Sequence, residues 1–244
     1  MMQRSFELIA FDGDDTLWHN ERSYREGRDR LRRLLAAAGV DLSAEELETR
    51  VNTIEFANLQ YFGYGVSSFT LSIIEAAIVL TSGRIAAADV GQLVAMAKRM
   101  MAEEIELFAS ARDTVAALSA VYPLMLITKG DLLHQTSKLD RSGLRRYFSF
   151  VEVVSHKTTD VYASILNRHG IDPDGFLMIG NSLRSDILPV IEVGAWAIHV
   201  PAALSWAHED ADEPDGSLDR YAQLPALGDV CDFVETFARS ARAR

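Results

Sequence analysis

Two contrasting patterns of apolar residues divide this chain. Residues 6–11 are apolar except for Glu7, which predicts a short buried strand. From about residue 20 to residue 108, apolar residues instead recur every three or four positions, which predicts about four helices. The peptides Gly63-Tyr64-Gly65 and Ser82-Gly83 interrupt this spacing and are expected to separate helices.

After residue 109, short apolar runs alternate with helical patterns. We expect strands at residues 6–11, 124–127, 150–154, 176–179 and 195–200, and helices near 113–121, 132–139, 159–169 and 185–193. Such alternation is typical of parallel strands covered on both faces. The predicted fold class is therefore α/β, a Rossmann-like parallel sheet of five strands flanked by helices. Its core comprises residues 1–18 and 109–244, and residues 19–108 form an inserted all-helical domain.

Composition limits the classes of partner. Hydrophobic residues make up 48% of the 244 positions and charged residues 24%, as in soluble globular proteins. The net charge of −11 argues against nucleic acid or an anionic membrane as the partner, so an anionic substrate needs local cations. The sequence has no leader-like or membrane-spanning segment, so we expect a cytoplasmic protein. The single cysteine, Cys231, is interpreted as a core residue, and the acidic run 208–216 as a solvated loop.

Polar side chains follow the predicted strands at the edge where an open parallel sheet binds its ligands. Asp12 and Asp14 leave the first strand on the same side, because residues two apart in an extended chain face the same way. Two carboxylates this close repel unless a cation or a shared proton compensates them, and we expect a divalent metal. The later strands are followed by Thr128-Lys129-Gly130, by Lys157, and by Gly180-Asn181-Ser182 leading to Asp186.

In this order the residues resemble the four motifs of the haloacid dehalogenase-like (HAD) hydrolase superfamily. The matching positions are Asp12-x-Asp14-x-Thr16, then Thr128, then Lys157, then Gly180-Asn181-Ser182 with Asp186. The helical insertion is similar to the C1-type cap of this superfamily, so the likeness covers nearly the whole chain. It implies an enzyme of the phosphatase branch.

The resemblance implies a role for each position. Asp12 is expected to attack phosphorus and form an aspartyl-phosphate, and Asp14 to act as general acid and then base. Thr128, the backbone N–H groups of Lys129 and Gly130, and the Lys157 ammonium are expected to bind the phosphoryl group. The expected cofactor is Mg²⁺, held by Asp12, the backbone carbonyl of Asp14, Asp186 and Asn181.

Two alternatives stay open at this point. A 2-haloacid dehalogenase expels a halide that needs no proton, and dehalogenases of this superfamily lack the second aspartate, so Asp14 favours a phosphatase. A catalytically silent member that binds a phosphorylated ligand is the other alternative.

Two positions depart from the common pattern of the superfamily. Asn181 stands where many relatives carry an acid, which predicts weaker Mg²⁺ binding. Asp15 replaces a frequent glycine and is interpreted as a turn residue.

Specificity is expected to come from the cap, which would exclude water from a small phosphorylated metabolite. Tyr64 is the predicted substrate contact there. The wider set of candidates lies near the first hinge or around the Gly63 and Gly65 loop, and comprises Arg22, Tyr24, Arg25, Tyr61, Phe62 and Ser67.

Overall fold

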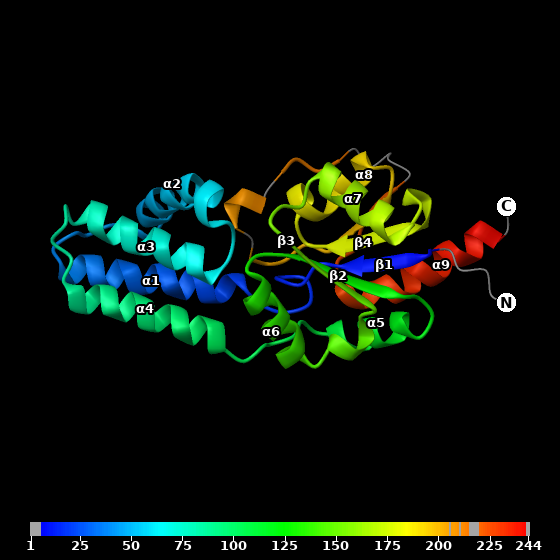
Figure 1. The fold of residues 1–244 in the computed structure, drawn as a ribbon, viewed down its shortest axis with the longest axis horizontal. Coiled ribbons are helices and arrows are strands. Elements are labelled where there is room, and N and C mark those ends of the chain that lie inside the picture. The colour runs from blue at the N-terminus through cyan, green and yellow to red at the C-terminus, as the bar shows by residue number, and fades with distance from the viewer. Residues whose placement is uncertain (1–5, 205, 210, 215–219, 243–244) are drawn as a thin grey trace. The chain divides into compact units, whose positions relative to one another are not determined.

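A computed structural model describes residues 6–204, 206–209, 211–214 and 220–242. Contacts divide the chain into two compact units (Figure 1). The α/β unit contains the chain up to His19, Ile105–Lys129 and the residues from Gln135 onward, and the helical unit contains Asn20–Glu104 with Gly130–His134. The segment Gly130–His134 groups with the helices although the sequence analysis assigns it to the α/β core.

The α/β unit contains a six-stranded parallel sheet in the order β3-β2-β1-β4-β5-β6. Its strands are β1 Leu8–Phe11, β2 Leu124–Lys129, β3 Phe150–Val154, β4 Phe176–Gly180, β5 Trp196–His199 and β6 Tyr221–Gln223. The prediction of a parallel α/β sheet is confirmed, but the number of five strands is wrong. The missed strand β6 has three residues, too few to produce an apolar pattern, and it forms by pairing with β5.

Strand β1 lies at the centre of the sheet, and its residues alternate between two cores. Ile9 and Phe11 pack in one apolar cluster, and Leu8 and Ala10 in the other. Helices α5 Ala111–Ser119, α6 Leu132–Ser142 and α9 Val230–Arg242 lie on the first side, and α7 Thr159–His169 and α8 Leu188–Glu192 on the second (Figure 1). Shorter helical turns are Arg145–Tyr147, Pro173–Gly175, Leu183–Ile187, Ala207–Glu209 and Leu227–Asp229.

The strand order reverses between β1 and β4, because β2 continues from one side of β1 and β4 from the other. In open α/β sheets such a reversal opens a crevice beyond the carboxyl ends of the strands. The residues that follow β1 and β4 therefore lie where this fold places its ligands.

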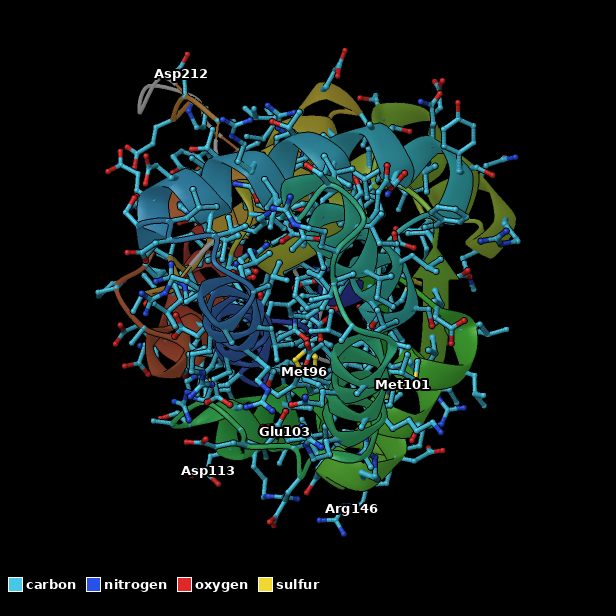
Figure 2. The ribbon with its side chains drawn as sticks, turned by 90° about the vertical axis from the view of Figure 1, so that its left-hand side faces the viewer. Met96, Met101, Glu103, Asp113, Arg146 and Asp212 are labelled. Carbon is cyan, nitrogen blue, oxygen red and sulfur yellow. The ribbon has the colours of Figure 1, made fainter. Side chains whose placement is uncertain are left out.

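The helical unit consists of α1 Glu21–Ala37, α2 Ala44–Phe62, α3 Val66–Leu80 and α4 Ala87–Ala102. Its apolar core is formed by residues such as Leu31, Ile73 and Met96, and Figure 2 shows Met96 between α1 and α4. Charged side chains such as Asp113 and Arg146 of the α/β unit project outward in the same view. None of the described helices combines the length and apolar character needed to cross a bilayer.

A buried ion-pair triad joins α1 to α2 inside the helical unit. The Arg28 guanidinium donates to Glu21 Oε1 at 3.0 Å and to Glu55 Oε2 at 2.9 Å, and all three residues are buried. Burial raises the pKa of Glu55, although the charge of Arg28 opposes this shift. The triad depends on Arg28, because its two carboxylates would otherwise share the same interior.

Candidate active site

A tight loop after β1 presents the first two acids. Asp12 is aligned with the sheet by its N–H, which donates to the Ile179 carbonyl at 2.9 Å. The loop then folds back through a hydrogen bond from Leu17 N–H to the Gly13 carbonyl at 2.8 Å. Asp15 occupies the left-handed region with φ of 60°, as its interpretation as a turn residue requires.

Lys157 joins two carboxylates that come from different strand ends. Its Nζ lies 2.5 Å from Asp12 Oδ1 and 2.7 Å from Asp186 Oδ1. The three residues are nearly inaccessible to solvent, with exposures of 6% for Asp12, 6% for Lys157 and 1% for Asp186. Side chains separated by up to 174 positions in the sequence thus meet in one buried cluster, as the sequence analysis predicts.

Thr16 connects the β1 loop to the turn after β4. Its Oγ1 accepts a hydrogen bond from Asn181 N–H at 3.0 Å. The hydroxyl lies 3.2 Å from Asp12 Oδ2 and 3.1 Å from Asn181 Oδ1, and it can donate to one of them. Asn181 therefore belongs to this cluster, with its amide oxygen turned toward Thr16.

Asp186 is held by the helical turn that follows β4. Ser182 N–H donates to Asp186 Oδ2 at 3.0 Å, and Asp186 N–H donates to the Ser182 carbonyl at 2.8 Å. The turn is a π-helix over Leu183–Ile187, a rare geometry that is often found at functional sites. Gly180 makes room for this carboxylate, since a Cβ there would lie 2.3 Å from Asp186 Oδ2.

The Asp14 carboxylate turns toward α6 rather than toward Lys157. Lys138 Nζ donates to Asp14 Oδ1 at 2.8 Å, Gln135 Nε2 donates to Oδ2 at 2.9 Å, and Trp18 Nε1 donates to Oδ1 at 2.6 Å. Sequence reasoning missed all three partners. Gln135 and Lys138 are three positions apart and so share one face of α6, but the sequence does not show that this face packs near the β1 loop.

Thr128 carries a buried hydroxyl for which the described residues supply no hydrogen-bond partner. The residue lies in β2, next to β1, and is 1% exposed. A buried polar group without a partner is costly and needs an explanation, such as a catalytic role or a bound water or ion. The expected contact of Thr128 with a phosphoryl oxygen stays a prediction.

Burial and charge act in opposite directions on the ionisable groups of the cluster. Burial and the nearby Asp186 raise the pKa of Asp12 to about 7, while Lys157 opposes the shift. Burial alone would lower the pKa of Lys157, but Asp12 and Asp186 raise it above its ordinary value, so the ammonium stays charged. Burial would also raise the pKa of Asp14, but the charge of Lys138 and the hydrogen bonds lower it.

The donor set suits a hard divalent cation. Asp12 and Asp186 provide carboxylate oxygens, Asn181 provides an amide oxygen, and one lysine compensates only one of the two buried negative charges. Mg²⁺ prefers such oxygen ligands and keeps several waters. No group of three His, Cys, Asp or Glu side chains within the described ranges is arranged to hold a metal.

Glu209 is a further charged group beside these strand ends. It lies in the acidic run 208–216, and the interpretation of that run as a solvated loop is wrong for this residue; positions 210, 215 and 216 of the run lie outside the described residues. Its carboxylate contacts Lys129 Nζ, Ser182 Oγ and Ser185 Oγ. A carboxylate in an acidic run gives no sequence signal of such a contact.

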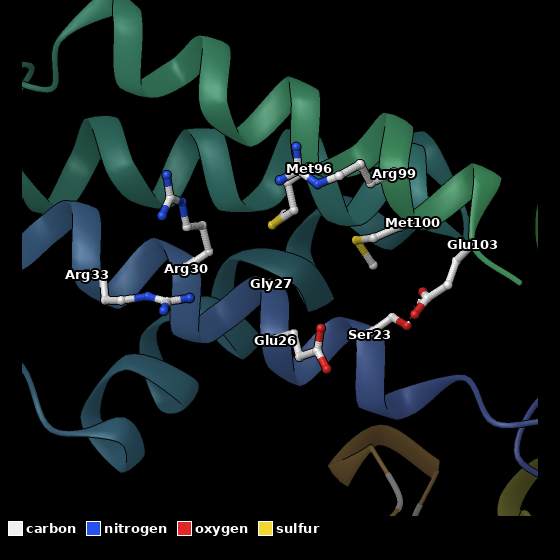
Figure 3. A pocket seen from close by; sticks show the side chains of 9 residues that line it. All are labelled: Ser23, Glu26, Gly27, Arg30, Arg33, Met96, Arg99, Met100 and Glu103. Atoms are coloured by element: carbon white, nitrogen blue, oxygen red, sulfur yellow. Dashed lines mark hydrogen bonds between the residues drawn. The ribbon is translucent and has the colours of Figure 1, made fainter.

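The helical unit contains a separate groove of about 580 Å³ between α1 and α4 (Figure 3). Guanidinium groups gather toward one part of it and carboxylates toward the other, with Met96 and Met100 buried between the two helices. None of the residues predicted for catalysis lines this groove. Tyr64 lies in the loop between α2 and α3, and its contact with substrate stays a prediction.

The chain resembles known proteins over most of its length. A 2-haloacid or phosphate-ester specificity is not implied by the fold alone. The chain is 26% identical over 218 residues to glyceraldehyde 3-phosphate phosphatase from Methanothermobacter thermautotrophicus, covering 86% of this chain and 92% of the relative.

Solved structures resemble the chain over nearly its whole length. A haloacid dehalogenase-like family hydrolase from Xanthomonas campestris has a TM-score of 0.86 and 37% identity, with 99% of this chain and 96% of that chain covered. A HAD-hydrolase from Bacillus subtilis bound to magnesium has a TM-score of 0.67 at 19% identity, with 96% and 100% covered, which shows the fold alone. The sequence profile of the haloacid dehalogenase-like hydrolases matches residues 6–194, and the chain therefore belongs to this family.

Proposed function

We propose that this protein is a Mg²⁺-dependent phosphomonoester hydrolase that acts through an aspartyl-phosphate on Asp12. The observation that carries the proposal is the buried contact of Lys157 Nζ with Asp12 at 2.5 Å and with Asp186 at 2.7 Å. This contact places the proposed nucleophile, the Asp12 carboxylate, beside the charged Lys157 ammonium, which can bind a transferring phosphoryl group.

In the first step, a carboxylate oxygen of Asp12 forms a bond to phosphorus as the bond from phosphorus to the ester oxygen breaks. Asp14 gives its proton to the departing alkoxide. In the second step, Asp14 takes a proton from water while the water oxygen attacks phosphorus and releases Asp12 with inorganic phosphate. Thr128 donates its buried hydroxyl to a phosphoryl oxygen, and Lys157 stabilises the charge on the phosphoryl group.

Asp14 favours phosphate-ester hydrolysis over dehalogenation, and its protonation state matters for each step. A halide leaves without a proton, whereas an alkoxide requires the acid that Asp14 supplies. In the arrangement described above, Lys138 lowers the pKa of Asp14 and favours the ionised form. That form suits the hydrolytic second step, and the protonated form needed for the first step requires a weaker contact with Lys138.

Asp12, Asp186, Asn181 and the Asp14 carbonyl would hold Mg²⁺. When bound, the ion would neutralise negative charge on the phosphoryl group and favour ionised Asp12. The chain's own residues then orient the nucleophile, because Thr16 and Lys157 each contact a different oxygen of Asp12.

The substrate class is a small phosphorylated metabolite. The 26% identical relative that is named a glyceraldehyde 3-phosphate phosphatase makes triose phosphates the first compounds to screen. The helical unit would act as the C1-type cap and Tyr64 as one of its substrate contacts. A cytoplasmic location fits such a substrate and stays a prediction.

The test is hydrolysis of p-nitrophenyl phosphate with added Mg²⁺ by the wild type, Asp12→Asn and Asp15→Asn. We expect Asp12→Asn to lose activity by at least about 10⁴-fold, because removal of a nucleophile eliminates the covalent route. Asp15→Asn makes the same chemical change three positions away, at a left-handed residue that asparagine tolerates, and should retain activity.

Circular dichroism of Asp12→Asn should match the wild type, so that a loss of activity is not a loss of fold. Near-normal hydrolysis by Asp12→Asn would contradict the nucleophile assignment. Halide release from 2-haloacids without added metal would support the dehalogenase instead, and no turnover of any phosphate ester would support a silent ligand-binding protein.

A further inference from the structure

Glu209 is the point at which the segment between β5 and β6 contacts the carboxyl ends of β2 and β4. It ends the short helical turn Ala207–Glu209. Its Oε2 accepts hydrogen bonds from Ser182 Oγ at 2.5 Å and Ser185 Oγ at 2.6 Å, and its Oε1 contacts Lys129 Nζ. Charge-assisted bonds of this kind are stronger than those between neutral groups.

Three donors, two from the turn after β4 and one from the end of β2, therefore converge on one carboxylate, whose side chain is 16% exposed. Burial would raise the pKa of Glu209, but Lys129 and the two hydroxyls lower it to about 2. The carboxylate is consequently ionised across the neutral range. Lys129 Nζ also donates to Ser185 Oγ at 2.8 Å, so the four side chains form one network.

The network leads directly to the proposed metal ligand. Ser182 Oγ accepts from Ser185 N–H at 3.0 Å, and Ser182 N–H donates to Asp186 Oδ2 at 3.0 Å. The other oxygen of Asp186 contacts Lys157. A change at Glu209 weakens the contacts of both serine hydroxyls, and Ser182 is the residue whose backbone N–H holds Oδ2 of Asp186.

We propose that Glu209 is a positioning residue that holds the Ser182–Asp186 turn and Lys129 in place, and so sets the affinity of the site for Mg²⁺. This inference rests on the proposed function, because it concerns the same site. Partners outside the ligand sphere orient the ligands themselves, and their mutation typically lowers metal affinity by about 10- to 100-fold. Glu209 reaches the ligand through two hydrogen bonds, so the lower part of that range applies.

The experiment measures Mg²⁺ binding by isothermal titration calorimetry on the full chain, at a temperature well below unfolding. We compare the wild type with Glu209→Gln, which keeps the shape of the side chain but removes the charge that accepts three donors. Glu213→Gln is the matched control, since it removes the same charge from an exposed position of the same segment. The expected result is a Kd about 10-fold weaker for Glu209→Gln and within about twofold of wild type for Glu213→Gln.

A purely structural role for Glu209 would lower the unfolding temperature but leave the Mg²⁺ Kd of the folded protein unchanged. A Glu209→Gln Kd within about twofold of wild type, with wild-type binding intact, would therefore overturn the inference and leave the proposed function standing. Absence of both Mg²⁺ binding and phosphate hydrolysis in the wild type would remove the function and this inference with it.

Ser185→Ala keeps the inference testable if Glu209→Gln does not fold. This variant leaves the Glu209 charge and the pairing with Lys129 in place and removes one hydroxyl from the network. We expect its Mg²⁺ affinity to fall in the same direction by a smaller factor. Unchanged affinity in Ser185→Ala would then overturn the inference.

Discussion

Thr128→Val should stabilise the protein and impair its activity at the same time. The Thr128 hydroxyl is buried and has no hydrogen-bond partner among the described residues. Leaving such a group unpaired costs about 1 to 3 kcal/mol, and valine replaces the hydroxyl by a methyl group of similar shape. Because valine also suits a strand, we expect the free energy of unfolding to rise by about 1 kcal/mol.

The matched control is Thr114→Val in α5. Thr114 is also buried, but its Oγ1 donates to the Leu227 carbonyl at 3.2 Å. Removing a satisfied hydrogen bond should lower the free energy of unfolding by about 1 kcal/mol. The same chemical substitution is therefore expected to have opposite signs at the two positions, which urea denaturation without added ligand can measure.

The two variants should also differ in activity, with Thr128→Val impaired and Thr114→Val nearly unaffected. If the Thr128 hydroxyl donates to the transferring phosphoryl group, its loss should reduce kcat by roughly 10²- to 10³-fold, as for removal of one oxyanion donor. Thr114→Val should retain nearly full activity, because it lies in α5 and forms none of the contacts of the cluster. Destabilisation of Thr128→Val with hydrolysis within about threefold of wild type would show that the hydroxyl is structural.

Two further substitutions test the packing of each unit. Gly180→Ala should displace the Asp186 carboxylate, since the new Cβ would lie 2.3 Å from its Oδ2. We expect it to lower the free energy of unfolding by about 1 to 3 kcal/mol and to weaken Mg²⁺ binding. The control Gly91→Ala has open space around it in α4 and should stabilise the protein in urea, and an unaffected Gly180→Ala would contradict the geometry. Arg28→Ala should lower the free energy of unfolding by about 3 to 5 kcal/mol, because it leaves two buried glutamates without their cation. The control Arg25→Ala removes an arginine whose side chain is 51% exposed and should change the free energy of unfolding by less than about 1 kcal/mol. Equal urea midpoints for these two arginine variants would refute the role of the triad.

The sheet could be predicted where its strands are long and buried. Strand β1 and strand β4 are apolar throughout, and each is followed at once by a change to polar residues. Strand β6 has only Tyr221–Gln223 and partly exposed side chains, so its structure depends on the neighbouring β5 rather than on its own pattern. Helix α9 is not predicted, although Val230, Val234 and Ala238 recur at helical spacing.

The candidate site could likewise be predicted only in part. Asp12, Lys157 and Asp186 could be predicted to meet, because parallel strands bring their carboxyl ends to one edge and the motif order assigns each residue to a strand end. The partners that fix them could not. Lys138 approaches Asp14 from a helix face, and Glu209 approaches from a segment whose acidic composition indicates solvent exposure, so both contacts depend on tertiary packing that has no local signature.

The distribution of charge connects these missed partners to the proposed cofactor. Lys138 contacts Asp14, Lys129 contacts Glu209, and Lys157 contacts both Asp12 and Asp186. The first two contacts are balanced, so among these described residues one negative charge is left over, and it lies in the pair that shares Lys157. A phosphate monoester brings further negative charge to this edge of the sheet. Under the proposed function, binding it beside Asp12 would therefore require a cation in addition to these three lysines. The pKa of Asp12 is raised first by burial and then by the charge of Asp186, so a bound cation would also favour its ionised form.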